Sequence, residues 1–229
     1  SAHLSESRGG SAALGGIDVT KRGWWMDQVA AKKLADRLNW IPSAVMSLTF
    51  LSPMLLFWSA AFGPMRSDHL APAPLSVALI GALSSCVLGA LALLVDDRYF
   101  ALRPVEKSGR LHESLGARWI RRVITNGDLI NRHVRSRHPG YRVLRGDDAL
   151  RNFARECDTA EKGHLLLFLG GVGSAAAALA LGWNGWCAVL VSGNVISNLG
   201  PIVLQRYNRA RLERIQRRPR KDRIAACAT

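Results

Sequence analysis

The sequence predicts an all-α integral membrane protein built from two transmembrane helical hairpins, with an amphipathic helix at the membrane interface before them. Hydrophobic residues make up 48% of the 229 residues, yet the formal net charge is +14, so the two kinds of residue are segregated along the chain. Four stretches free of charge are close to the roughly 20 residues that cross about 30 Å of hydrocarbon. They are 41–63, 74–95, 165–183 and 186–204.

The distribution of positive charge predicts the topology of these four spans. Of the 31 Lys and Arg residues, six precede the first span, fifteen lie between 96 and 162, nine follow 204, and only Arg66 lies elsewhere. Positive residues collect on the side that is not translocated. Both termini and the central segment are therefore expected on one side of the membrane. Four buried helices of a soluble protein are the alternative, but soluble core helices seldom run this long without a charge.

The first half of the chain divides into three parts. Residues 1–20 are small, polar and glycine-rich, which is typical of an extended tail. Residues 21–40 alternate apolar and cationic side chains at helical spacing, with Trp24, Trp25 and Trp40 at the ends, as expected of an interfacial amphipathic helix. Residues 41–95 then form the first membrane hairpin.

The remaining parts are a basic membrane-proximal segment at 96–162, a second hairpin at 163–204 and a basic tail at 205–229. The arginines lie near the membrane ends without a nucleic-acid-binding motif, so anionic lipid headgroups are the expected partner and nucleic acid is not. The four cysteines are scattered singly, and they indicate neither a zinc site nor a disulfide framework.

The second hairpin differs from the first in its small and polar residues. Residues 170–182 are almost all Gly, Ala and Ser, which allows helix backbones to approach closely. Asn194 and Asn198 lie inside the last span, where polar amides either join helices or line a site.

A second polar cluster precedes the third span. Residues 153–168 are predicted to form a helix that starts in water and enters the membrane, and Glu156, Glu161 and His164 can face one pocket from it. A solvated glutamate and a satisfied histidine are the simpler interpretation. However, a Glu and a His at the end of a span are costly unless they are partnered. A metal site made of the three residues is a further alternative, although no other His or Cys recurs at ligand spacing.

The fourth span ends in an unusually polar string, QRYNRAR, at 205–211. Hairpin geometry brings this string to the same membrane side as the Glu/His helix. It can form one pocket with that helix, or it can serve as a stop-transfer cap that binds lipid phosphate. The candidate substrate- or lipid-binding residues are Asn198, Gln205, Arg206, Tyr207, Asn208, Arg209 and Arg211.

These motifs resemble those of the CrtO-type glycosyl diaponeurosporenoate acyltransferases, small bacterial membrane enzymes that esterify a fatty acyl group onto the sugar of a glycosylated carotenoid. The resemblance rests on Asn198, Pro201 and QRYNR, and on Glu156, Ala160, Glu161 and His164 at the family's spacing. DRYF (97–100) and GARWIRRV (116–123) also resemble the family, so the likeness covers roughly 96–215. The chain departs from the family pattern at 123–128, which read VITNGD.

The resemblance implies acyl transfer to a sugar hydroxyl. His164 would take the hydroxyl proton, Glu161 would orient the imidazole, and Glu156 would complete the catalytic group. Asn208, Gln205 or an arginine would stabilise the oxyanion, and Arg206, Arg209 and Arg211 would hold the phosphates of an acyl thioester or a lipid headgroup. No other cofactor and no metal are expected.

Two functions from different classes follow from these observations. The chain lacks an initiator Met and carries a glycine-rich tail, which favours a processed accessory subunit of a larger energy-transducing complex in an organellar, mitochondrial inner membrane. Such a subunit would bind lipid through its Glu/His/QRYNR cluster. The alternative is an active membrane acyltransferase for a glycolipid or glycosylated isoprenoid, in the bacterial cytoplasmic membrane.

Overall fold

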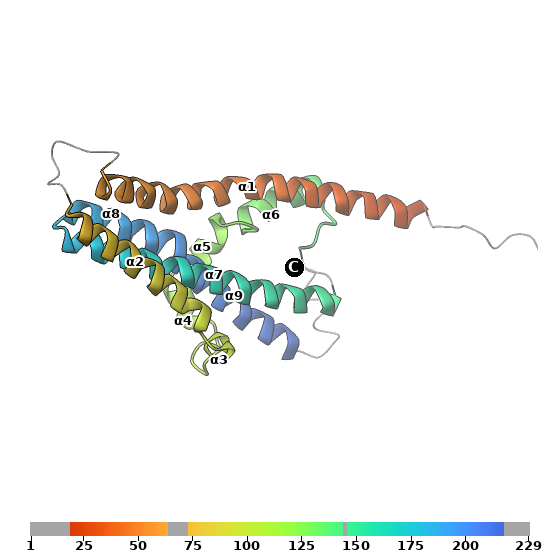
Figure 1. The fold of residues 1–229 in the computed structure, drawn as a ribbon. Helices are drawn as coiled ribbons and strands as arrows, with labels where there is room; N and C mark the ends of the chain where they lie inside the picture. Colours follow the sequence, from red (N-terminus) through yellow and green to blue (C-terminus); the bar gives the residue numbers. More distant parts are fainter. Residues whose placement is uncertain (1–18, 64–72, 144–145, 218–229) are drawn as a thin grey trace, which may run out of the picture.

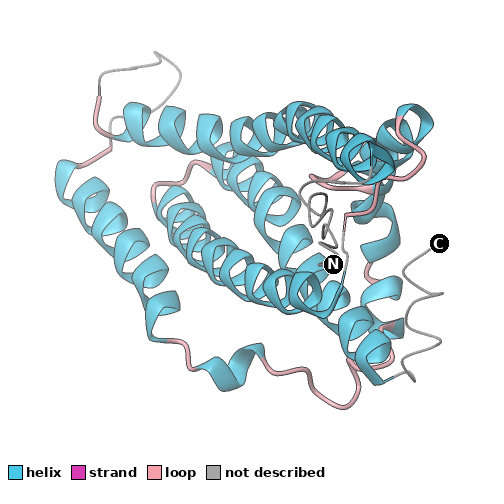
Figure 2. Ribbon diagram, turned by 90° about the vertical axis from the view of Figure 1, so that its right-hand side faces the viewer, coloured by secondary structure: helices cyan, strands magenta, loops and turns pink. Residues whose placement is uncertain are grey.

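Helices make up the regular structure of the computed structural model, which describes residues 19–63, 73–143 and 146–217 (Figures 1 and 2). Four helical rods run along the molecule: α1 (Val19–Ala61), α2 (Leu75–Leu91), α7 (Gly146–Ala180) and a composite fourth rod. The fourth rod consists of α8 (Asn184–Asn194), the π-helical segment η2 (Val195–Leu199) and α9 (Gly200–Arg217). In the described parts of the chain no strand occurs, so the all-α prediction is confirmed.

Each of the four rods is long and apolar enough to cross a membrane. Many large apolar side chains on them are exposed in the isolated chain, for example Leu79 and Leu83 of α2 at 53% and 67%. On helices of this length, such faces are typical of transmembrane helices that contact hydrocarbon. The chain is therefore an integral membrane protein with the two predicted hairpins. The loop that contains Arg66 lies outside the described residues, as do the C-terminal residues after 217 and all but the last two residues of the predicted tail 1–20.

Small residues hold α2 against α7 at the centre of the bundle. A Cβ atom on Gly173 would lie 2.7 Å from Ser85 Cα, and one on Gly81 would lie 2.7 Å from Ala177 Cβ. Only glycine at these positions lets the two backbones come this close. The close approach predicted for the small residues of 170–182 is confirmed.

An aromatic cluster marks the end of the bundle where the hairpins turn. The ring of Phe57, near the end of α1, lies 5.9 Å from the ring of Trp183, between α7 and α8, and 6.2 Å from that of Trp186 in α8. The end of α1 and the start of α2 lie at the same end of the molecule as the turn between α7 and α8 (Figure 1), as two antiparallel hairpins require.

The predicted interfacial helix 21–40 is not a separate element, because α1 continues through it into the first span without a break. Its apolar stripe packs on protein: Ala31 and Ala35 form a buried cluster with Val134 and Tyr141, from α6 (Asp128–Arg137) and the residues after it. Likewise, the predicted basic tail 205–229 is helical as far as Arg217.

The basic segment between the hairpins folds into short helices at the other end of the bundle. After the short 3₁₀ turn η1 (Ala92–Leu94), these are α3 (Asp97–Phe100), α4 (Arg110–Ser114), α5 (Ala117–Val123) and α6. Helices α4 and α5 pack on α9, and α6 packs on α1. The segment therefore bridges α1 and α9, and it closes one side of the space between them.

Candidate functional site

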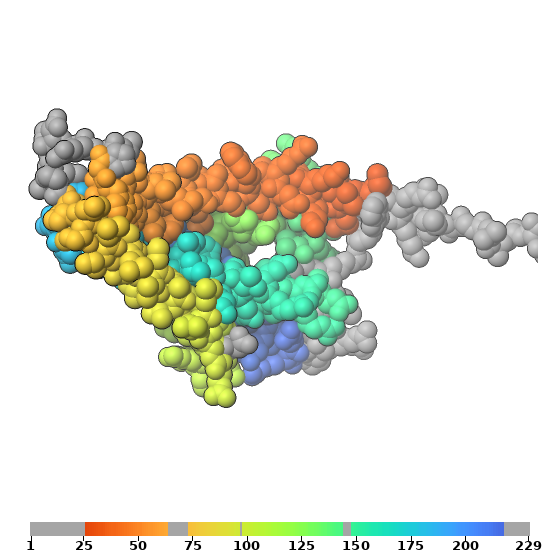
Figure 3. Space-filling model, viewed as in Figure 1, coloured from red at the N-terminus to blue at the C-terminus, as the bar shows by residue number. Residues whose placement is uncertain are grey.

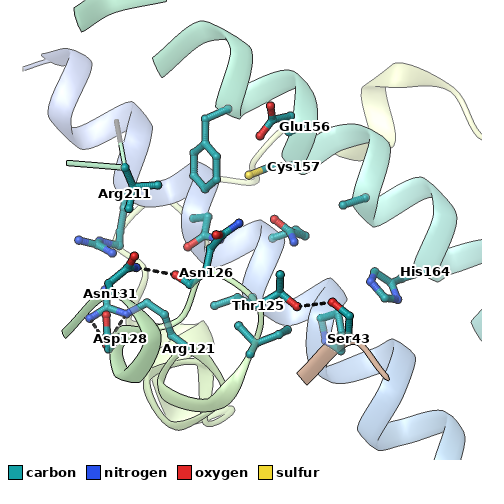
Figure 4. A pocket seen from close by; sticks show the side chains of 18 of the residues that line it. Ser43, Arg121, Thr125, Asn126, Asp128, Asn131, Glu156, Cys157, His164 and Arg211 are labelled. Atoms are coloured by element: carbon teal, nitrogen blue, oxygen red, sulfur yellow. Dashed lines mark hydrogen bonds and ion pairs between the residues drawn. The ribbon is translucent and has the colours of Figure 1, made fainter. Parts of the chain in front are cut away.

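An open cavity of about 650 Å³ lies at the charged end of the bundle, between α1, the α5–α6 segment, α7 and α9. In the space-filling view, the molecule is hollowed between α1 and α7 (Figure 3). The cavity brings together residues that are more than 150 positions apart in the sequence, since Ser43 lies on its wall with Arg211 (Figure 4).

The α7 wall presents one face of a regular helix. Glu156, Ala160 and His164 line the cavity together with Cys157. Residues four apart on an α-helix lie one above the other, so 156, 160 and 164 form a single stripe. The α9 wall is the corresponding stripe of that helix, and it includes Pro201, Gln205, Asn208 and Arg211. The predicted meeting of the Glu/His helix with the end of the fourth span is confirmed for these residues.

His164 is held from inside the bundle by an amide. Its Nδ1 lies 3.3 Å from Oδ1 of Asn198. The Asn198 side chain is only 1% exposed, and its Nδ2 donates to Oδ1 of Asn194 at 2.8 Å. Asn198 was predicted to bind substrate or lipid, but the structure turns it away from the cavity and against the histidine. The other imidazole nitrogen, Nε2, makes no hydrogen bond to a described side chain.

Pro201 explains why the fourth span is distorted at this point. Proline has no N–H to donate one turn back, and its ring crowds the carbonyl four residues earlier. The helix accommodates this with the π-helical turn η2 (Val195–Leu199) immediately before α9. Such π-turns are frequent at functional sites, and this one contains Asn198.

Glu161 does not orient His164, which corrects the sequence-based expectation. Its carboxylate is fully buried and pairs with two arginines of α9: with Arg206 at 2.8 Å and with Arg209. Glu161 and His164 are three residues apart, which separates their directions by about 60° around the helix. Helix α9 packs between these two directions, so Glu161 and His164 lie on different sides of α9.

Arg206 and Arg209 do not line the cavity, because their guanidinium groups are bound within the protein. Arg206 also pairs with Glu106 at 2.8 Å and donates to the carbonyl of Tyr99 at 2.9 Å. Arg209 pairs with Asp158 at 2.9 Å and donates to the carbonyl of Phe100. These guanidinium groups join α9 to α7 and to the α3 region, so they do not line the cavity as the predicted phosphate-binding groups. Arg211 does line it.

Tyr207 is also bound within the protein and does not line the cavity. Its ring is buried against Ala117 and Leu204, and its hydroxyl donates to Oε1 of Glu113 at 3.1 Å. Burial tends to raise the pKa of Glu113, but the Tyr207 hydroxyl and the Arg118 guanidinium outweigh this and lower it. The carboxylate thus stays ionised and ties α4 to α9.

A second buried pair supports this side of α9. Nε2 of His112 lies 3.6 Å from Oε1 of Glu106, and both side chains are almost fully buried. Burial raises the pKa of Glu106, but the N–H of Arg103 and the guanidinium of Arg206 lower it below its usual value overall. Burial also lowers the pKa of His112, against the attraction of Glu106. Near neutral pH, the pair is therefore an ionised carboxylate beside a neutral imidazole.

The fourth wall of the cavity, the α5–α6 segment, was missed by the sequence analysis. Arg121 donates through two nitrogens to Oδ2 of Asp128, at 3.0 and 2.8 Å. Thr125 and Asn126 lie in the turn between the two helices, and Asn126 has a positive φ of 57°. The Asn-Gly pair at 126–127 is a turn signal that could have placed this element, but nothing local indicates what it faces.

A pair of asparagines fixes that turn to α1. Nδ2 of Asn39 donates to Oδ1 of Asn126 at 2.6 Å, and the Asn126 backbone N–H donates to Oδ1 of Asn39 at 2.5 Å. Asn131 donates to the Asn126 carbonyl at 2.7 Å, while its own Oδ1 is buried without a partner among the described residues.

The cavity is polar and carries a positive balance. Four arginines line it, against two carboxylates, Asp128 and Glu156; the arginines are Arg121, Arg135, Arg142 and Arg211. Only Arg121 among the four forms an ion pair with a described residue, and the guanidinium of Arg211 lies 5.9 Å from the Tyr207 ring centroid. In the described part of the chain, no group of three or more His, Cys, Asp or Glu side chains could hold a metal ion.

Comparison with known proteins agrees with this site. The family model described as glycosyl-4,4'-diaponeurosporenoate acyltransferase, CrtO, matches residues 96–218. The match begins at the helix cap of α3 and includes α7, η2 and α9, which carry His164, Asn198 and the QRYNR string. No curated protein and no solved structure matches the chain significantly. With more than half of its length covered by the family model, the chain belongs to the CrtO family of glycosyl-4,4'-diaponeurosporenoate acyltransferases.

Proposed function

We propose that this protein transfers a fatty acyl group to a hydroxyl of a glycosylated lipid or isoprenoid, with the cavity as its active site. The observation that carries the proposal is the position of His164. Its Nδ1 is held by a buried amide, and it shares a polar cavity with Gln205, Asn208 and Arg211 of the opposing helix. The family match supports the same class of reaction.

His164 is the general base in this proposal. Nε2 takes the proton of the acceptor hydroxyl as the hydroxyl oxygen attacks the carbonyl carbon of the acyl donor. The tetrahedral intermediate carries a negative charge on the former carbonyl oxygen, for which the amides of Gln205 and Asn208 and the guanidinium of Arg211 are donors. The intermediate collapses by breaking the bond from carbon to the leaving group. The protonated imidazole returns its proton to that leaving group.

The positive balance of the cavity favours an anionic donor or acceptor. An acyl thioester that carries phosphates would place them against Arg135, Arg142 and Arg211, which are not neutralised by described carboxylates. Anionic membrane lipids are the other expected partners, since the four apolar rods would hold the opening of the cavity near the lipid headgroups. Glu156 is the exposed carboxylate of the α7 wall, where it can accept hydrogen bonds from sugar hydroxyls.

The prediction of an accessory subunit in an organellar complex has no support in the structure or the comparisons. The catalytic alternative is favoured because the cavity contains a base and oxyanion donors that a lipid-binding anchor does not need. The family match likewise favours a bacterial membrane over a mitochondrial one.

A cavity-filling variant tests whether the reaction takes place here. Full-length protein in detergent, with a long-chain acyl thioester and a glycosylated carotenoid acid, is expected to give an acyl ester that mass spectrometry detects. Ala160→Phe places a ring in the cavity wall and is expected to abolish the product. Ala176→Phe, on the exposed face of the same helix, is the matched control and is expected to retain it. Equal product from the two variants, or none from the wild type, would contradict the proposal.

A further inference from the structure

We propose that Asn194 and Asn198 are positioning residues that force His164 into the tautomer with its proton on Nδ1, and so leave Nε2 free to act as a base. The three side chains form a relay that starts at a backbone carbonyl of α7. Nδ2 of Asn194 donates to the Phe168 carbonyl at 2.9 Å, Nδ2 of Asn198 donates to Asn194 at 2.8 Å, and Asn198 Oδ1 faces His164 Nδ1 at 3.3 Å.

The direction of every bond in the relay follows from its fixed end. The Phe168 carbonyl can only accept, so the amide nitrogen of Asn194 must face it. The Asn194 oxygen then faces Asn198, so the amide nitrogen of Asn198 must donate to it. That leaves only the oxygen of Asn198 to face His164. An oxygen acceptor opposite Nδ1 requires a proton on Nδ1.

This arrangement opposes the intrinsic preference of the imidazole. A neutral histidine side chain in water favours the proton on Nε2, which would leave no lone pair there for the acceptor hydroxyl. The hydrogen bond made by one ring nitrogen sets which nitrogen carries the proton. With Nδ1 turned into the bundle, Nε2 carries the free lone pair of a residue that lines the cavity.

The packing of Gly171 against Asn194 independently indicates that the fold fixes the position of the Asn194 amide. A Cβ atom on Gly171 of α7 would lie 2.6 Å from Asn194 Nδ2 and 2.9 Å from its Oδ1. Only a glycine leaves room for the amide between α7 and the fourth rod. Both asparagines are almost completely buried, at 2% and 1% exposed, and their amides bond only each other, Phe168 and His164 among the described residues.

Nitrogen-15 NMR of the full-length protein, labelled at histidine and held in detergent micelles or nanodiscs, tests the relay without reference to activity. At about pH 8.5, well above the ordinary histidine pKa of about 6.5, each imidazole reports its tautomer through its two nitrogen shifts. Subtracting the spectrum of His164→Gln identifies the signals of His164. The relay predicts a protonated Nδ1 and an unprotonated Nε2 in the wild type.

Three variants separate the relay from general effects on folding. Gly171→Ala is expected to displace the Asn194 amide and shift His164 toward the Nε2–H tautomer. Asn194→Ala is expected to do the same without overpacking, so the test survives if Gly171→Ala fails to fold. Gly163→Ala is the matched control on the same helix, because a Cβ atom there meets nothing within 4 Å. It is expected to leave the tautomer unchanged.

The outcomes also separate this inference from the proposed function. Only the expected effect of the relay on acyl transfer rests on that function. A wild-type Nε2–H tautomer, or an Nδ1–H tautomer that persists in Asn194→Ala and Gly171→Ala, overturns the relay. An Nδ1–H tautomer that both variants lose supports the relay, even in a protein that transfers no acyl group. Where transfer is measured, the variants are expected to lower kcat about 10–100-fold with little change in KM, since a positioning residue acts on the base.

Discussion

Arg209 of α9 and Glu161 of α7 form an ion pair in which the Glu161 side chain is fully buried. Glu161 binds Arg206 as well, so one carboxylate anchors two consecutive turns of α9. This anchor sets the rotation of α9 against α7. Gln205 and Asn208, each about 100° around the helix from the anchored arginine that follows it, consequently face the cavity.

Removing the anchoring carboxylate should destabilise the protein more than removing an exposed one. Glu161→Ala leaves two guanidinium groups without their shared partner, and loss of one member of a buried pair costs about 3–5 kcal/mol. Glu213→Ala, which breaks exposed pairs with Lys107 and Arg217, should cost only about 0–1 kcal/mol. Unfolding in detergent, followed by tryptophan fluorescence, measures both. Equal stability of the two variants would show that the buried pair does not anchor α9.

The contact between α2 and α7 should be intolerant of a single methyl group at one position. Gly173→Ala would place a Cβ atom 2.7 Å from the Ser85 backbone, which must shift because a backbone atom cannot rotate away. Overpacking of this kind costs about 1–3 kcal/mol. Gly163→Ala meets nothing and should be neutral or stabilise the helix by up to about 1 kcal/mol. Unfolding of both variants in detergent, followed by tryptophan fluorescence, would count against this packing if Gly173→Ala were the more stable.

Stability should rise with pH across the range in which an ordinary histidine titrates. Burial lowers the pKa of His112 in the folded protein below the ordinary histidine value of about 6.5, so the unfolded chain binds the proton more readily. The stabilisation is complete above that value and is lost as the pH falls through it toward the lower folded pKa. The lowered pKa of Glu106 acts in the same direction at more acidic pH.

The measurement is the unfolding temperature of wild type and His112→Gln between mildly acidic and mildly alkaline pH. Glutamine at this position has no proton to gain, so the slope near the ordinary histidine pKa should become shallower in the variant. Identical slopes would mean that His112 titrates in the folded protein as it does in the unfolded chain.

The asparagine pair between α1 and the α5–α6 turn should matter for both stability and activity. Asn39→Ala leaves the Asn126 backbone N–H and side chain without their partner, and a buried unsatisfied group costs about 1–3 kcal/mol. The freed turn carries Thr125 and Asp128 in the cavity wall, so KM for the acyl acceptor should increase. Asn152→Ala, which removes only an exposed contact with Arg155, should change neither quantity.

Much of the architecture could be predicted from composition and periodicity. Charge-free stretches of membrane length gave the four spans, and hairpin geometry placed the α7 and α9 stripes together. Periodicity also predicted that Glu156, Glu161 and His164 face one pocket, of which the cavity contains only Glu156 and His164. It could not report which neighbour packs between His164 and Glu161, because a helical wheel contains no information about the docking angle of a second helix. The catalytic orienting role predicted for Glu161 was wrong for that reason.

The positions of the 124–128 turn and of the Asn198 side chain depend on long-range contacts, which the sequence could not reveal. The Asn-Gly pair indicates a turn at 124–128, but the place of this turn in the cavity depends on Asn39, which is 87 residues from Asn126. Asn198 was identified as a functional polar residue inside a span, but its direction depends on the π-turn before Pro201. Positions 1–18 and 218–229 lie outside the described residues, so the extended tail predicted at the N-terminus stays a prediction.

The most direct test of the central claim is the rate of acyl ester formation by His164→Gln, compared with His133→Gln in the same detergent and with the same acyl thioester and glycosylated acceptor. His133 lies exposed on α6 and lines no part of the cavity. If His164 is the base, its loss should reduce kcat by about 100–10,000-fold, while His133→Gln keeps the wild-type rate. A His164→Gln protein that folds normally and retains the wild-type kcat would contradict the assignment of the cavity as the active site.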